Sequence, residues 1–129
     1  MNYSPTVIDH FRSPRNAGTM RRPDAVGESE DGNCGDLARF HLRIEAGRVA
    51  EARFQTYGCG PAIAASSLAT ELVRGRAVES LRQLTAEEIE AALGGLPESR
   101  RHAAGVVAAA LRAAAASGRR PAAGEVRGV

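Results

Sequence analysis

Apolar and polar residues alternate along two neighbouring segments in the first half of the chain. Over residues 38–44, large apolar side chains occupy every second position, a period that is typical of a strand with one buried face. Residues 48–57 alternate in the same way, although less regularly. The three residues between these segments, 45–47, end in glycine and are suited to a turn. The two segments are therefore predicted to form an antiparallel hairpin.

Four further segments have the apolar spacing or the terminal residues of helices. Residues 5–11 form a short apolar face that ends before Pro14, because the residue preceding a proline is disfavoured in a helix. Residues 61–75 begin with proline and end with glycine, which suit a helix start and a helix end. Residues 85–93 open with the spacing of a capping box. The last helix is predicted over residues 97–116, with one apolar side.

The remaining segments are predicted to form a loop and a C-terminal tail. Residues 16–36 are rich in glycine and almost free of large apolar side chains, so a long loop is predicted there. Residues 117–129 also lack large apolar side chains and are predicted to be a flexible C-terminal tail. We find no internal repeat and no sign of a second domain, so residues 1–116 are interpreted as a single domain.

The amino-acid composition is that of a soluble globular domain. A chain of 129 residues with 43% hydrophobic and 25% charged residues can bury a core without help from a metal or a disulfide. Its N-terminus lacks the pattern of a secretory signal, and no apolar run is long enough to span a membrane. A cytoplasmic protein with reduced thiols is therefore expected. A net charge of +2 and 4% aromatic residues do not favour nucleic-acid binding.

The two cysteines, Cys34 and Cys59, are too few for a dense disulfide framework or a four-cysteine metal site. Any metal site must therefore recruit other ligand types. Both cysteines have glycine neighbours, which let the backbone approach a ligand closely. Cys59 is expected just before a helix N-terminus, a position that should favour its thiolate. With Asp36 and His102, the cysteines form a donor set for one tetrahedral zinc or for the two irons of a [2Fe-2S] cluster.

For each of these candidate ligands, a purely structural role is an alternative to metal binding. A single cysteine is commonly a small buried apolar residue, and Asp36 or His102 alone could be a surface or capping residue. Asp9 and His10 look like a ligand pair, but a capping or hydrogen-bonding role is expected for them on a short helix. His41 lies on the polar face of a strand and is expected to be exposed. Spacing alone does not show that the four candidate ligands meet.

At several motifs the sequence resembles the iron-sulfur cluster scaffold family of the IscU and NifU N-terminal type. The resemblance extends from Tyr3 to about Ala116. It is carried by the opening residues 3–18, by Cys34-Gly35-Asp36, and by the nearly continuous run at residues 52–67, Ala-Arg-Phe-Gln-Thr-Tyr-Gly-Cys-Gly-Pro-Ala-Ile-Ala-Ala-Ser-Ser. It implies an α+β fold in which a small antiparallel β-sheet packs against helices.

The resemblance also implies a function and a set of ligands. In this family, which has a scaffold rather than an enzymatic role, a cysteine desulfurase supplies sulfur, iron binds at the cysteine-rich end, and the labile [2Fe-2S] cluster passes to apo iron-sulfur proteins. The family's ligands correspond to Cys34, Asp36, Cys59 and His102. The third cysteine of the family, which is implicated in accepting sulfur, corresponds to Ala103. The segment that a chaperone recognises is also altered, at residues 96–100, so we expect no dedicated Hsp70-type chaperone to bind it.

Three functions remain open at this point. The first is a scaffold or carrier that uses the reduced ligand set to bind iron and a labile cluster. The second is an accessory protein that binds zinc or iron and no longer assembles clusters, because alanine at position 103 can neither carry sulfur nor ligate iron. The third is a thiol redox enzyme that uses Cys34 and Cys59. The third is the least favoured, because no Cys-x-x-C motif is present.

Overall fold

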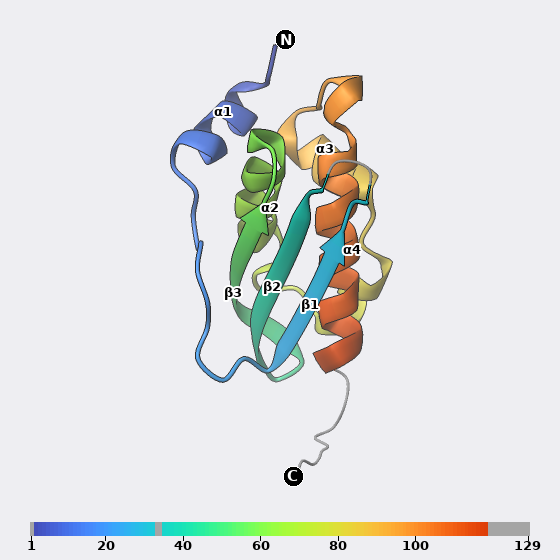
Figure 1. The fold of residues 1–129 in the computed structure, drawn as a ribbon. Coiled ribbons are helices and arrows are strands. Elements are labelled where there is room, and N and C mark those ends of the chain that lie inside the picture. The colour runs from blue at the N-terminus through green and yellow to red at the C-terminus, as the bar shows by residue number, and fades with distance from the viewer. Residues whose placement is uncertain (1, 33–34, 119–129) are drawn as a thin grey trace.

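The computed structural model describes residues 2–32 and 35–118. In this part of the chain, an antiparallel sheet is covered on one face by helices (Figure 1). The three strands follow the order β1-β2-β3: β1 (Ala25–Glu30), β2 (Leu37–Glu45) and β3 (Arg48–Tyr57). The helices are α1 (Pro5–Arg12), α2 (Gly60–Val73), α3 (Ala86–Leu93) and α4 (His102–Gly118), with short 3-10 turns η1 (Val78–Gln83) and η2 (Glu98–Arg100). The predicted α+β fold is confirmed.

The predicted hairpin is present as β2 and β3. Glu45 pairs with Arg48, which leaves a two-residue turn in which Ala46 and Gly47 both have positive φ, as primed hairpin turns require. The alternating apolar residues of β2 face the helices and are fully buried at Phe40. The period of two therefore identified both the strands and the face that packs on the core.

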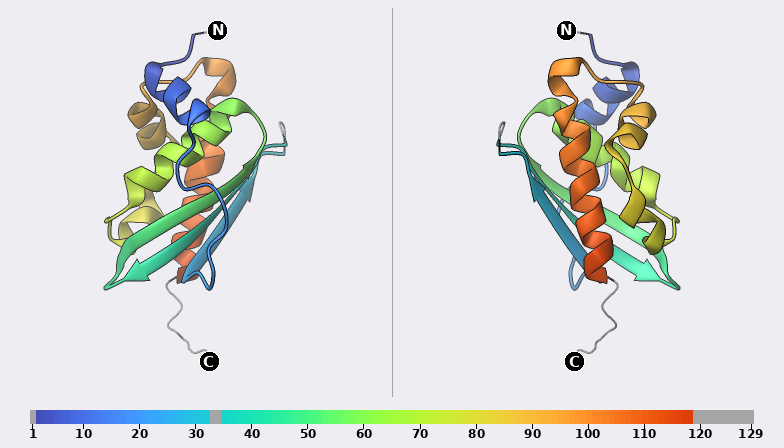
Figure 2. Two further views of the ribbon diagram at one scale, coloured as in Figure 1. Left: turned by 90° about the vertical axis from the view of Figure 1, so that its left-hand side faces the viewer. Right: turned by 90° about the vertical axis from the view of Figure 1, so that its right-hand side faces the viewer.

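The first strand, β1, corrects the prediction of a continuous loop over residues 16–36. Its two buried positions are Ala25 and Gly27, so the strand has no large side chains to alternate with polar ones. The side view in Figure 2 shows α4 lying along the helix-covered face of the sheet. At Gly27 the helix is so close that an added Cβ would overlap the backbone of Ala110 and Ala114. The close approach of α4 thus explains the small residues that concealed the strand.

Helix α4 also differs from its prediction at both ends. It begins at His102 instead of residue 97, because Pro97 has an extended backbone and the 3-10 turn η2 follows it. It continues to Gly118, two residues past the predicted end, and the remainder of the predicted tail lies outside the described residues. The helices at 5–12, 60–73 and 86–93 match their predictions closely. Among the described residues, no helix is both long and apolar enough to cross a membrane.

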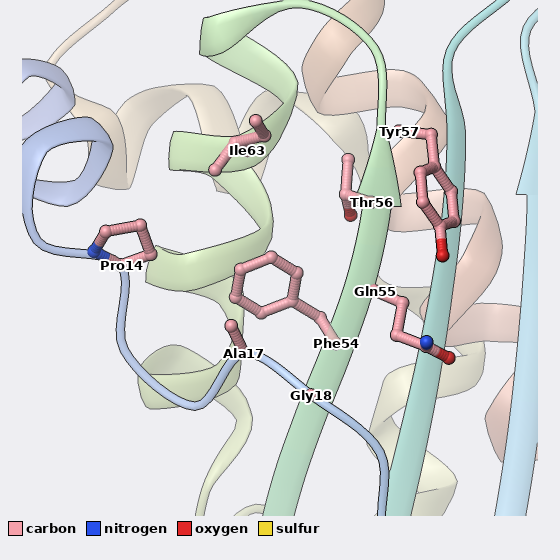
Figure 3. Close-up of a pocket in the computed structure, with 8 residues that line it drawn as sticks. All are labelled: Pro14, Ala17, Gly18, Phe54, Gln55, Thr56, Tyr57 and Ile63. Carbon is pink, nitrogen blue, oxygen red and sulfur yellow. The ribbon is translucent and has the colours of Figure 1, made fainter.

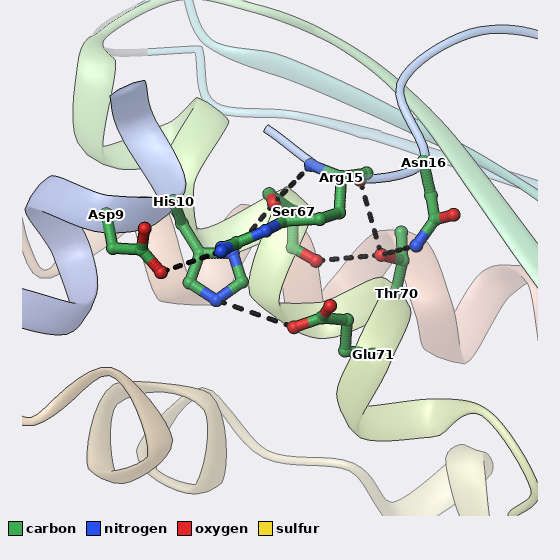
Figure 4. A network of polar contacts seen from close by, with 7 residues as sticks. All are labelled: Asp9, His10, Arg15, Asn16, Ser67, Thr70 and Glu71. Atoms are coloured by element: carbon green, nitrogen blue, oxygen red, sulfur yellow. Dashed lines mark hydrogen bonds and ion pairs between the residues drawn. The ribbon is translucent and has the colours of Figure 1, made fainter. Parts of the chain in front are cut away.

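A polar network fastens the N-terminal segment to α2 (Figure 4). His10 is buried, and its Nδ1 lies 2.7 Å from Ser67 Oγ, which also accepts the backbone N–H of Arg15 at 2.8 Å. The Arg15 side chain pairs with Asp9 at 2.8 Å, while Asn16 donates to the hydroxyl of a second α2 residue. The expected hydrogen-bonding role of His10 is confirmed.

The prediction that His41 is exposed is wrong. His41 is only 9% exposed, because it lies on the central strand β2, which has β1 on one side and β3 on the other.

Past this network, the N-terminal segment runs beside β3 and forms a parallel bridge between Ala17 and Phe54. A shallow pocket of about 290 Å³ opens there, and Figure 3 shows the Phe54 ring pointing toward Ile63 of α2. The described residues that line it offer no carboxylate, thiol or imidazole. The candidate chemistry therefore lies elsewhere, at the end of β3 that follows Tyr57.

Two buried histidines make the stability of the fold depend on pH. Burial lowers the pKa of His10 below 6.5, and Arg15 adds to this effect while Glu71 and Asp9 oppose it. Burial also lowers the pKa of His41, assisted by Arg39. Between each lowered pKa and 6.5, the unfolded chain binds more protons than the folded one. The contribution of these histidines to the free energy of unfolding is therefore expected to be fully present above this range and to be lost as pH falls through it.

The substitution His10→Gln tests this expectation, because glutamine can keep a hydrogen bond to Ser67 but does not titrate. Urea unfolding at about pH 7.5 and about pH 5.5 should show a smaller loss of stability in the variant than in the wild type. His41→Gln should remove the other part of the pH dependence. An equally steep loss in the double variant would contradict the assignment to these two histidines.

Candidate functional site

Three of the four predicted ligands meet at one end of the sheet. Asp36 directly precedes β2, Cys59 lies between β3 and α2, and His102 is the first residue of α4. Each offers a ligand atom, and these atoms all lie within 4.8 Å of one another. In the described ranges this is the single group of three or more such side chains that could hold a metal ion. The fourth predicted ligand, Cys34, lies outside the described residues.

The carboxylate of Asp36 is the centre of the group. Its Oδ2 lies 3.3 Å from Cys59 Sγ and 3.1 Å from His102 Nε2, and its Oδ1 accepts the backbone N–H of Cys59 at 3.1 Å. The side chain of Asp36 is 3% exposed, whereas that of His102 is 22% exposed. A buried carboxylate thus holds a thiol and a partly accessible imidazole in contact distance.

Cys59 occupies the N-cap position of α2, as its glycine and proline neighbours predicted. Its pKa nevertheless rises, mainly because burial disfavours the thiolate, and the hydrogen bond and charge of Asp36 add to the rise. The hydrogen bond from the Ala62 backbone and the charge of Arg100 act in the opposite direction. The helix N-terminus thus favours the thiolate through the Ala62 N–H, as expected, but burial and Asp36 outweigh it and the pKa rises overall. A bound metal would have to displace the thiol proton.

Gly58 was noted in the sequence as a glycine neighbour of Cys59, but its relation to Asp36 is visible only in the structure. Its φ of +146° is in the region that favours glycine. An added Cβ would lie 2.6 Å from the carboxyl carbon of Asp36 and would overlap its Oδ1. A glycine directly before a candidate cysteine was the available signal. Its role is to leave room for the central carboxylate.

We expect Gly58→Ala to weaken metal binding without removing any ligand. The new methyl group must displace the carboxylate of Asp36, a candidate ligand, and changing a residue that orients a ligand typically costs about 10- to 100-fold in metal affinity. Competition with a chromophoric chelator for Zn²⁺ measures the effect. Gly47→Ala is the matched control, because Gly47 also has positive φ but a Cβ there meets nothing within 4 Å. Equal zinc affinities in the two variants would contradict the proposed crowding.

The donor set determines what the site can bind. It combines a thiol sulfur, a carboxylate oxygen and an imidazole nitrogen, ligands that suit zinc and iron better than magnesium or calcium. Ala103, which follows His102 in the sequence, is fully buried and offers no donor. The described part of the site can therefore supply three ligands to a metal.

Comparison with known proteins places the chain in a family. Residues 2–121 match the model of the NifU-like N-terminal domain. An iron-sulfur cluster assembly scaffold protein IscU of Archaeoglobus fulgidus is 41% identical over 112 residues, covering 87% of this chain and 73% of the relative. The nitrogen fixation protein NifU of Cereibacter sphaeroides is 51% identical over 111 residues, which cover 86% of this chain and 45% of the longer relative.

A solved structure supports the fold. The crystal structure of a nitrogen-fixing NifU-like protein (N-terminal) from Brucella abortus superimposes with a TM-score of 0.73, covering 92% of this chain and 94% of the other. Its sequence is 17% identical, so this likeness speaks for the fold alone. The family model, in contrast, spans the sheet, the helices and all the candidate ligands. The chain therefore belongs to the family of NifU-like N-terminal domains.

Proposed function

We propose that this protein is an iron-sulfur cluster assembly scaffold that binds iron and a labile [2Fe-2S] cluster and passes the cluster to apo-proteins. The observation that carries the proposal is the convergence of Asp36, Cys59 and His102 within 4.8 Å at one end of the sheet. Cys34, two residues before Asp36, is proposed as the fourth ligand. The curated relatives that carry the scaffold name supply the class of cargo.

The contacts of Asp36 suggest how such a site releases its cargo. A carboxylate is a hard ligand that binds a soft cluster weakly. When the cluster leaves, Asp36 can accept hydrogen bonds again from Cys59 and His102, at the 3.3 Å and 3.1 Å separations seen here. The hydrogen bonds thus compensate in part for the lost metal bonds. A site built in this way favours transfer over permanent storage.

The proposal extends to partners and location. A cysteine desulfurase is the proposed source of sulfur, apo iron-sulfur proteins are the proposed acceptors, and the cytoplasm is the proposed compartment. The protein acts as a scaffold and not as an enzyme. Because residues 96–100 depart from the family's chaperone segment, we propose that no dedicated Hsp70-type chaperone binds there; measurable affinity of such a chaperone for this peptide would refute that part.

Anaerobic reconstitution tests the proposed function. The chain is incubated with ferrous iron, cysteine, a cysteine desulfurase and a thiol reductant that reduces the persulfide sulfur to sulfide, freed of small molecules, and then mixed with an apo-ferredoxin. We expect visible charge-transfer absorption on the chain that moves to the ferredoxin. Absence of a cluster on the chain would refute the scaffold function.

The alanine at position 103 favours one competing function, an accessory protein that binds zinc or iron without assembling clusters. That function predicts bound zinc without acid-labile sulfide. The proposed scaffold function instead predicts that Cys34 and Cys59 suffice as sulfur ligands. Metal and sulfide analysis of the same sample separates the two.

A further inference from the structure

A segment that begins with two left-handed glycines leads into the helix that carries His102. Helix α3 ends at Leu93, and Gly94 and Gly95 follow it with φ of +83° and +98°. The short turn η2 comes next, and α4 then begins at His102. Glycine has more conformational freedom than any other residue. The position of His102 therefore depends on what fixes this lead-in segment, residues 94–101.

One carboxylate contacts both ends of the lead-in segment. Glu90 lies on α3, and its side chain is 18% exposed. Its Oε2 accepts the backbone N–H of Leu96 at 3.4 Å, and its Oε1 accepts the Nε–H of Arg101 at 3.0 Å. The backbone carbonyl of Glu90 also accepts the N–H of Gly95 at 2.9 Å. A single residue of α3 thus holds the segment near its beginning and at its end.

The contact with Arg101 acts on the start of α4. The Arg101 carbonyl accepts the backbone N–H of Ala104 at 3.1 Å, so Arg101 closes the first turn of this helix. His102 lies within that turn, and its Nε2 lies 3.1 Å from Asp36 Oδ2. Metal ligands must be held to within about 0.5 Å of their productive position. A displacement of Arg101 would therefore disturb the placement of the imidazole.

A second glutamate on α3 has the same type of partner but does not reach the lead-in segment. Glu88 Oε2 pairs with Arg76 Nη1 at 2.7 Å, and Arg76 lies just beyond the end of α2. Glu88 thus ties α3 to a different part of the chain. Because both glutamates are only partly exposed and both pair with an arginine, they form a matched pair for comparison.

We propose that Glu90 is a positioning residue for His102. By binding Leu96 and Arg101 at once, its carboxylate fixes the segment that leads into α4 and so holds the imidazole against Asp36. Glu90 itself donates nothing to the metal. The inference deepens the proposed function, because it rests on His102 as a metal ligand.

A double-mutant cycle tests whether Glu90 acts through His102. Zn²⁺ affinity is measured by chelator competition in wild type, Glu90→Ala, His102→Ala and the double variant. Glu88→Ala is the matched control. The cycle is repeated with Glu90→Gln, which keeps one carbonyl oxygen as an acceptor, so that the result does not depend on the folding of the alanine variant. Thermal unfolding verifies that each variant is folded.

We expect Glu90→Ala to lower Zn²⁺ affinity about tenfold, the lower end of the usual cost of changing a residue that supports a ligand. In the His102→Ala background, the same substitution should change the affinity less than about twofold, because the ligand on which it acts has gone. Glu90→Gln should lose less affinity than Glu90→Ala. Glu88→Ala should match wild type within about twofold.

An equal loss from Glu90→Ala in both backgrounds would overturn the inference, since a general structural defect acts whether or not the imidazole is present. Wild-type affinity in Glu90→Ala, or an equal loss in Glu88→Ala, would also overturn it. Wild-type affinity in His102→Ala would refute the imidazole as a ligand and, with it, the inference. Because the cycle uses Zn²⁺ alone, a chain that acquires no cluster would refute the scaffold function without changing the result of the cycle.

Discussion

Replacing Cys59 by alanine is expected to abolish cluster binding and to lower Zn²⁺ affinity by at least about 100-fold, because a soft thiolate is the strongest ligand of the group for either metal. Among the described ligand candidates, Cys59 alone carries sulfur. The measurements are visible absorption, acid-labile sulfide and chelator competition. Unfolding should change little, since Cys59 is only partly buried and precedes α2.

Cys59→Ser is the informative control. Serine keeps the approximate size of the side chain and a hydroxyl that can donate to Asp36, but it replaces a soft ligand by a hard one. If Cys59 serves only to hold Asp36, serine should preserve metal binding. We expect serine to fail nearly as completely as alanine. Wild-type zinc affinity in Cys59→Ser would contradict the ligand role.

The second large effect concerns the fold. Gly27→Ala is expected to destabilise the domain by about 3 kcal/mol or more, at or above the upper end of the usual cost of overpacking a well-packed core. The added methyl group would overlap backbone atoms of Ala110 and Ala114 and lie 2.6 Å from the Cα of Ala114. Backbone atoms in a packed helix cannot move aside as a flexible side chain can. Urea unfolding measures the loss.

Gly105→Ala provides the control, because Gly105 lies in α4, the helix that packs against Gly27. A Cβ at Gly105 meets nothing within 4 Å, and alanine is favoured over glycine inside a helix by roughly 0.5–1 kcal/mol. The control should therefore be neutral or stabilised. Equal stability of Gly27→Ala and Gly105→Ala would contradict the close packing of β1 on α4.

The three strands show how far the sequence could predict the fold. The hairpin of β2 and β3 was predictable because large apolar side chains alternate over a buried face. The strand β1 was not, because Ala25 and Gly27 bury almost no side chain. Its position depends on contact with α4, which is distant in sequence. Local patterns report burial by side chains and miss burial by backbone.

The same distinction applies to the candidate site. Glycine neighbours and residue types singled out Asp36, Cys59 and His102 as ligand candidates, but their convergence depends on where the ends of three elements meet. The role of Gly58 was harder to identify, because it lies in the space that this residue leaves for Asp36. Such properties exist only in three dimensions.

The most direct test of the central claim is the metal and acid-labile sulfide content of the protein purified anaerobically from cells. A scaffold that holds a labile cluster at Asp36, Cys59 and His102, with Cys34, should contain iron with about one sulfide per iron. Both should be lost on brief exposure to a chelator. Zinc at about one per chain without acid-labile sulfide would contradict the scaffold function and favour a metal-binding accessory protein.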